Sequence, residues 1–125
     1  MKKLSSNSLF EKQAGYSRMI GNDDWVLSAG TTGFDYQNMT IDKELEKQVL
    51  KTIKNIEEYL AEYDCTLKDV IQCNWIITKR KYFKVTGEIL KQYFFKSKPV
   101  MMTTVCKLID KRMKFEMQII AKKSS

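Results

Sequence analysis

Acid–base chemistry in this sequence is limited first by a missing residue type, because the 125 residues contain no histidine. Neither a Ser-His-Asp nor a Cys-His nucleophile system can be built, and the usual histidine-containing zinc site is excluded as well. Proton transfer near neutral pH must therefore use a carboxyl group, a tyrosine, a cysteine, a lysine or an ordered water. We expect no metal site and no cofactor.

One stretch rich in glycines and polar residues, "GYSRMIGNDDWVLSAGTTGFD", covers residues 15–35. It lacks the lysine and the spacing of a P-loop, which argues against a nucleotide-binding loop. Residues 25–28 have the composition of a strand, and the glycines that follow suit the backbone of a turn. We therefore predict a strand followed by a cleft-forming loop, with these candidate lining and rim residues: Ser28, Gly30, Thr31, Asp35 and Tyr36.

Glu116 is the carboxylate that the sequence pattern least supports as a solvent-exposed surface residue. In "KFEMQIIA" it alternates with apolar residues, so it lies on a strand that carries apolar side chains on both faces. Burying a carboxylate there is unfavourable without a function or a partner. Arg18 and Arg112 are its candidate ion-pair partners, and either could instead anchor an anionic ligand.

Two amphipathic helices and six strands are predicted to position these residues. Apolar residues recur at spacings of three and four over residues 42–64, and a second apolar stripe covers residues 82–95. Runs of β-branched and aromatic residues predict six strands, at residues 8–13, 17–20, 25–28, 70–78, 101–108 and 113–121. The order βββαβαββ predicts an α+β two-layer sandwich, in which two helices cover one face of a mixed sheet.

The other face of this sheet has no predicted cover. The segments "CNWIIT" and "KFEMQIIA" carry large apolar residues on both faces. An apolar sheet face left without helices is usually buried in another subunit, which predicts a homo-oligomer. Clefts between subunits would then be natural sites for a small-molecule ligand.

Length and composition fit a single domain over residues 1–125. The three cysteines form no C-x-x-C pair and fit small buried thiols in a reducing compartment. No apolar run approaches the roughly 20 residues needed to span a bilayer, and no secretory signal is evident, so we expect a cytoplasmic protein. The net charge of +7 comes mostly from scattered lysines, so a nucleic-acid partner is not favoured.

Three segments in order, "GYSRMIGNDDWVLSAGTTGFDYQNMTI", "NIEEYLAEYDCTLKDV" and "DKRMKFEMQIIA", resemble the Rid family. These are the YjgF-type proteins, also labelled reactive intermediate deaminases, translation inhibitors or endoribonucleases of the L-PSP type. The resemblance covers about residues 10–121. It implies a chorismate-mutase-like fold and a homotrimer whose ligand clefts lie between neighbouring subunits.

The activity that this resemblance implies is hydrolysis of imines and enamines to carbonyl compounds and ammonia. An imine carbon is already electrophilic, so the protein need only hold the substrate, place a water and manage a proton. By resemblance, Tyr16 matches the family's tyrosine, Ser28 its serine, and Glu116 the glutamate that would orient the water.

The family's carboxylate-binding arginine is missing at the matching position. It would stand two residues after Pro99, where this chain has Met101, and Thr103 replaces the family's cysteine on the same strand. A thioether offers nothing comparable to the charge-assisted hydrogen bonds of a guanidinium. The pattern resembles an arginine-lacking branch of the family.

Three hypotheses for the function follow. The first is an imine or enamine deaminase with an altered substrate range. The second is a non-catalytic trimer that binds a small molecule, for which the missing arginine is a positive sign. The third, less favoured, is RNA binding or cleavage, which the basic charge suggests but for which no catalytic group is evident.

Overall fold

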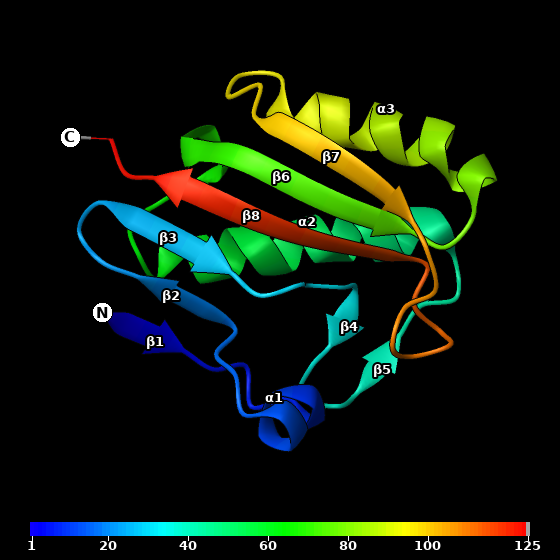
Figure 1. Ribbon diagram of the computed structural model, residues 1–125, viewed down its shortest axis with the longest axis horizontal. Helices are drawn as coiled ribbons and strands as arrows, with labels where there is room; N and C mark the ends of the chain where they lie inside the picture. The colour runs from blue at the N-terminus through cyan, green and yellow to red at the C-terminus, as the bar shows by residue number, and fades with distance from the viewer. Residues whose placement is uncertain (125) are drawn as a thin grey trace.

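The computed structural model describes residues 1–124, and its main sheet has the strand order β1-β2-β3-β8-β6-β7 (Figure 1). The six strands are β1 (Lys2–Leu4), β2 (Met19–Gly21), β3 (Trp25–Ser28), β6 (Val70–Ile77), β7 (Val100–Val105) and β8 (Phe115–Lys122). Only β6 and β7 pair in parallel, because the helix α3 (Phe83–Phe94) carries the chain back between them. The predicted α+β class with a mixed sheet is confirmed.

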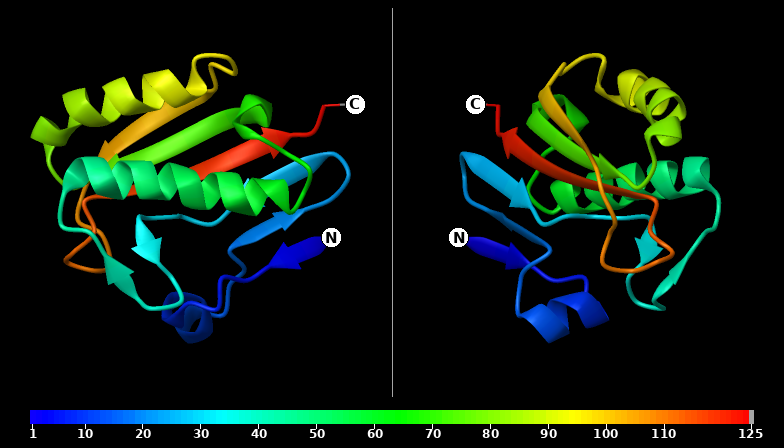
Figure 2. Two further views of the ribbon diagram at one scale, coloured as in Figure 1. Left: turned by 180° about the vertical axis from the view of Figure 1, so that it is seen from behind. Right: turned by 45° about the vertical axis from the view of Figure 1, so that its right-hand side comes forward.

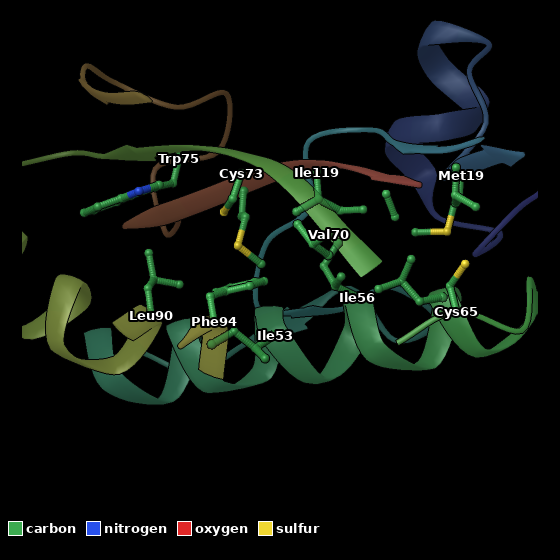
Figure 3. Packing of buried hydrophobic residues seen from close by; sticks show 14 of the residues in the cluster. Met19, Ile53, Ile56, Cys65, Val70, Cys73, Trp75, Leu90, Phe94 and Ile119 are labelled. Carbon is green, nitrogen blue, oxygen red and sulfur yellow. The ribbon is translucent and has the colours of Figure 1, made fainter. Parts of the chain in front are cut away.

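Two helices cover one face of this sheet, as predicted. Seen from behind, α2 (Leu45–Ala61) crosses in front of the strands, while α3 lies beside β6 and β7 (Figure 2). The apolar stripe of α2 is buried at Val49, Ile53, Ile56 and Leu60. Figure 3 shows side chains of both helices meeting those of the sheet in one continuous layer. Burial of this layer is the main stabilising contribution to the fold.

One predicted element is wrong, because residues 8–13 do not form a strand. They lie largely in the short helix α1 (Leu9–Ala14). Ser8 accepts a hydrogen bond from the backbone N–H of Glu11, and the Glu11 carboxylate accepts one from the backbone N–H of Ser8. This reciprocal capping satisfies donors at the first turn and starts the helix. The first strand of the sheet is β1, which precedes α1.

A small hairpin outside the main sheet consists of β4 (Phe34–Asp35) and β5 (Thr40–Ile41). Phe34 of this hairpin forms a second buried apolar cluster with Tyr36 and Met113. The hairpin therefore fixes Tyr36 and the segment before β8 against the body of the protein.

The face of the sheet away from the helices carries polar and exposed side chains. Along β8, every second residue from Phe115 is buried toward the helices, while Glu116, Gln118 and Ile120 point to the other face. Leu27 of β3 and Met102 of β7 are among the exposed apolar side chains. Within residues 1–124, no helix has both the length and the apolar character to cross a membrane.

Candidate functional site

A cavity of about 310 Å³ lies where α1, the loop after β3 and the start of β8 come together. Five of the predicted site residues line it: Tyr16, Arg18, Gly30, Tyr36 and Glu116. The rest of its wall is formed by Phe10, Gln13, Ala14, Thr32, Ile109 and Met113. The structure thus brings together residues that are about a hundred positions apart in the sequence.

Arg18 is fully buried and bonded on several sides. Its Nη1 donates to the backbone carbonyl of Gly30 at 2.7 Å and to Oγ1 of Thr31 at 3.5 Å. Its Nε donates to Oγ of Ser6, and its Nη2 forms an ion pair with Glu11 at 3.4 Å. A buried guanidinium requires such partners, because an uncompensated charge in the interior is strongly destabilising.

Glu11 holds the other end of this ion pair. Its carboxylate accepts hydrogen bonds from Oγ of Ser5, from the backbone N–H and hydroxyl of Ser6, and from the backbone N–H and hydroxyl of Ser8. Burial alone would raise the pKa of Glu11, but the hydrogen bonds from Ser6 and Ser8 and the charge of Arg18 lower it to about 2. Glu11 is therefore ionised at neutral pH, and the pair carries no net charge.

Glu116 is the second carboxyl group whose pKa is affected by the charge of Arg18, and its surroundings differ from those of Glu11. It is partly buried, and no hydrogen-bond donor within residues 1–124 lowers its pKa. Burial raises the pKa of Glu116, and the charge of Arg18 only partly opposes that rise. A carboxyl group with a raised pKa in a cleft can exchange a proton closer to neutral pH than an exposed one.

The loop after β3 lies directly against this carboxyl group. A methyl group added at Gly30 would come within 2.8 Å of the Glu116 carboxyl carbon, so glycine allows the close approach. Thr31 exchanges two backbone hydrogen bonds of 2.8 Å with Met117, which holds the loop on β8. Thr31 itself is fully buried.

Two tyrosines flank the guanidinium of Arg18. The ring of Tyr36 lies 4.0 Å from its central carbon, and the ring of Tyr16 lies 5.6 Å from it. Tyr36 is buried, and its hydroxyl accepts a hydrogen bond from the backbone N–H of Thr32 at 2.8 Å. Burial raises the pKa of the Tyr36 hydroxyl. Tyr16 keeps 39% of its surface exposed at the cavity rim, where a ligand can reach it.

Ser28 lies on the buried face of β3 and does not line this cavity. Its Oγ accepts a hydrogen bond of 2.9 Å from the backbone N–H of Ile119. The serine hydroxyl thus joins β3 to β8 near the site rather than facing it.

Met101 and Thr103 lie on the helix-covered face of the sheet. Met101 pairs with Cys73 and Thr103 pairs with Trp75, both of which point toward the helices. The neighbouring residues of β7, Met102 and Thr104, share the face of Glu116. Neighbouring residues of a strand point to opposite faces, so Met101 and Thr103 do not share the face of Glu116 within one chain.

A second cavity of about 290 Å³ lies on that open face. It shares Gly30 and Glu116 with the first cavity. Its other lining residues are Asn74, Trp75, Ile76, Met102, Thr104 and Gln118. Glu116 therefore lies at the junction of two hollows, the first lined mostly by apolar atoms and the second by polar and apolar atoms in similar amounts.

Arg112 is separate from this site. Its guanidinium pairs with Asp110 at 3.0 Å and is 54% exposed. The hydrogen bond from Arg112 lowers the pKa of Asp110. Asp35 also lies outside the main cavity, because its carboxylate accepts hydrogen bonds from Gln37 and Asn38 and caps the β4–β5 turn. Neither residue lines the cavity around Glu116.

No set of three or more potential metal ligands gathers within residues 1–124. Cys65 and Cys73 are buried as predicted, and burial raises the pKa of the Cys73 thiol to about 12. Cys106 is exposed, which corrects the expectation that all three thiols are buried. The cavity around Glu116 is lined by no cysteine, so its ionisable groups are carboxyl, phenol and guanidinium.

Sequence reasoning missed Glu11 and the contribution of Phe10 and Met113. The signal for Glu11 was present, because Ser8 followed three residues later by a glutamate is the pattern of a capping box. Phe10 and Met113 carried no comparable signal, since only the tertiary fold brings them to the cavity.

Comparison with known proteins shows which family this chain is similar to. The model of the family described as endoribonuclease L-PSP matches residues 7–123. A RutC family protein of Saccharolobus solfataricus is 26% identical over 110 residues, which are 87% of each chain.

Solved structures with a similar fold are also found. A member of the YjgF/YER057c/UK114 family from Mycobacterium tuberculosis is 29% identical, with a TM-score of 0.87 over 98% of each chain. RidA from an Antarctic Psychrobacter has a similar fold, with 21% identity and a TM-score of 0.80 over 86% of this chain and 88% of that one. Because the family model covers nearly the whole sequence, the chain belongs to the endoribonuclease L-PSP family, the Rid or YjgF family of the resemblance.

Proposed function

We propose that this protein hydrolyses imines or enamines to a carbonyl compound and ammonia, with Glu116 as the acid–base group. The observation that carries the proposal is the carboxyl of Glu116, which burial keeps at a raised pKa at the junction of two cavities. Such a group can accept a proton from water and return it within one reaction cycle.

In the first step, the Glu116 carboxylate takes a proton from water as the water oxygen bonds to the carbon of a protonated imine. The C=N double bond becomes a single bond, which leaves a neutral carbinolamine. The Glu116 carboxyl then returns its proton to the amine nitrogen. Ammonia departs as the C–N bond breaks and the C=O bond forms, and the hydroxyl proton passes to a solvent water.

The other predicted residues have supporting parts in this proposal. Tyr16 lines the cavity and is partly exposed, and its hydroxyl can donate a hydrogen bond to the bound substrate. Gly30 and Thr31 fix the loop against Glu116, and Ser28 joins β3 to β8 beside it. We assign Ser28 a positioning role rather than contact with the substrate.

The substrate range is proposed to differ from that of family members with an arginine after the proline of β7. Met101 supplies no charge there and lies on the other face of the sheet from Glu116. Met102 and Thr104, which line the second cavity, are the β7 residues that we propose to contact a ligand. The chain accordingly fits an arginine-lacking branch.

We also propose that the protein is a homotrimer with its small-molecule sites in clefts between subunits. The support is the sheet face without helices, where Leu27 is 43% and Met102 is 61% exposed. Apolar side chains on a continuous sheet face are typical of a surface that another subunit covers.

The test is release of ammonia from imines that an amino-acid oxidase generates in situ, compared with spontaneous hydrolysis. We expect the Glu116→Gln variant to lose roughly 10²- to 10⁴-fold of the acceleration, because its amide cannot exchange a proton. Glu88→Gln, the same change on an exposed carboxylate of α3, should leave the rate unchanged. Sedimentation of both variants should give the mass of a trimer.

Two outcomes would overturn the proposal. A Glu116→Gln variant with full activity would remove Glu116 from the chemistry. A wild-type protein that accelerates no imine in the panel would indicate a non-catalytic ligand-binding protein.

A further inference from the structure

The wall of the Glu116 cavity is mainly apolar. Phe10, Tyr36 and Met113 also belong to, or pack against, the second buried cluster, so these side chains are held in place. Ile109 completes the rim and is 84% exposed. A volume of about 310 Å³ is at the small end of ordinary ligand sites. The apolar wall favours an aromatic or branched apolar group on the ligand.

Arg18 is the one basic residue among those that line this cavity. A guanidinium has five N–H groups, and Arg18 directs one each to Ser6, Gly30, Thr31 and Glu11. Its side chain is completely buried. The ionised Glu11 balances its charge. Arg18 therefore lacks the pair of free, parallel N–H groups with which an arginine grips a carboxylate.

Glu116 adds a second reason for excluding an anion. Its carboxyl group faces the same cavity, so a carboxylate on the ligand would lie near a like charge. A neutral or protonated nitrogen suits this position instead, because the Glu116 oxygens can accept its hydrogen bond.

We propose that the cavity selects imines that lack a carboxylate and carry an aromatic or branched apolar group. The nitrogen lies toward Glu116, and the apolar group lies against Phe10 and Met113. The inference rests on the proposed imine hydrolysis for its catalytic part. Its selection against carboxylates rests on the apolar wall, on the commitment of Arg18 to other partners and on the Glu116 carboxyl group, and not on catalysis.

The first experiment compares two imines that differ in the carboxylate. An amino-acid oxidase makes the imine of phenylalanine, and a flavin amine oxidase makes the corresponding imine of phenethylamine. We expect the protein to accelerate ammonia release from the phenethylamine imine at least as strongly as from the phenylalanine imine. A preference of more than tenfold for the carboxylate-bearing imine would overturn the inference.

A binding measurement separates this inference from the proposed catalysis. Phenylacetamide and phenylacetate have nearly the same shape and differ in charge at neutral pH. We expect phenylacetamide to bind at least about tenfold more tightly than phenylacetate. The two affinities are measured by NMR titration, from the changes in chemical shift of the backbone amide and tyrosine signals. If no imine is hydrolysed but this preference holds, the proposed function fails and the ligand class stands. Tighter binding of phenylacetate would overturn the ligand class whatever the activity.

A charge added to the wall should reverse the preference. Gln13 is an exposed residue of α1 that lines the cavity, so Gln13→Arg places a free guanidinium there. We expect it to shift the ratio of the two affinities toward phenylacetate by about tenfold. Leu9→Arg adds the same charge one helical turn away, outside the cavity, and should leave the ratio unchanged. Equal effects of the two variants would mean that net charge, not the cavity, sets the preference.

Discussion

Glu11 and Glu116 share the field of one buried arginine, yet their surroundings are opposite. Glu11 accepts five hydrogen bonds from the serines of residues 5–8 besides its ion pair with Arg18, and its pKa falls to about 2. For Glu116, burial raises the pKa, and Arg18 is the one group that opposes the rise. The charge of the Glu11 carboxylate is therefore fully compensated by its partners, whereas the charge of the Glu116 carboxylate is not.

This difference shows how one cation can serve structure and chemistry at once. The carboxylate with saturated oxygens fixes Arg18 and neutralises its charge, so it contributes to stability. The carboxyl with unsaturated oxygens keeps its lone pairs for a ligand, and its burial is a cost that the fold carries. Three substitutions test whether the two sides really differ in this way.

Removing the shared cation should have the largest effect on stability. Arg18→Leu leaves Glu11 buried without its counter-ion, and we expect the free energy of unfolding to fall by about 3–5 kcal/mol. Urea denaturation followed by tryptophan fluorescence measures it.

Arg112→Leu is the matched control for Arg18→Leu. It breaks an exposed ion pair with Asp110 and should change stability little. Equal losses of unfolding free energy in the two variants would mean that the buried ion pair of Arg18 stabilises the protein no more than the exposed pair of Arg112. Changing both members of the buried pair, with Arg18→Leu and Glu11→Leu together, should recover part of the loss.

Glu11→Gln should have a smaller effect with a distinct pH dependence. At neutral pH we expect a loss of about 2 kcal/mol, because a neutral amide replaces a carboxylate in charge-assisted hydrogen bonds. The folded pKa of Glu11 is about 2, below its ordinary value of 4.5, so its contribution is complete above that value and is lost as the pH falls toward 2.

The difference in unfolding free energy between wild type and Glu11→Gln should therefore shrink from pH 5 to pH 2. Urea titrations at several pH values measure this difference. A difference that stays constant over that range would show that the role of Glu11 does not depend on its charge.

The two sides also differed in how well the sequence predicted them. The alternation of residues in β8 predicted that Glu116 lies on a strand, opposite to Phe115 and Met117, because a strand with one buried face has a strongly specified pattern. The apolar residues that recur at spacings of three and four predicted α2, and the β-branched and aromatic composition predicted β3. Glu11 was missed because α1 has only six residues, too few for a helical period to emerge. Its capping box was the better signal.

The partner strand of the site could not be placed from sequence pattern alone. Met101 and Thr103 were chosen by counting from Pro99, but the register between β6 and β7 puts Met102 and Thr104 on the face of Glu116. Register depends on contacts between strands and not on the composition of one strand. The assignment of Arg18 to Glu116 failed to anticipate Glu11 for a similar reason, since the serines that hold Glu11 gather only in the fold.

The smallest effect on stability, and the one of opposite sign, is expected for Glu116→Gln. The folded pKa of Glu116 is raised, so the folded state is most favoured when this carboxyl is protonated and loses stability as the pH rises through that pKa. A neutral glutamine avoids this loss, and we expect the variant to be equally stable or more stable at neutral pH, by less than about 1 kcal/mol. The two proteins should converge below the ordinary carboxyl pKa, where wild-type Glu116 is neutral as well. Urea titrations at pH 4 and pH 8 measure the difference, and a variant that is clearly less stable at pH 8 would place Glu116 with Glu11 as a structural carboxylate.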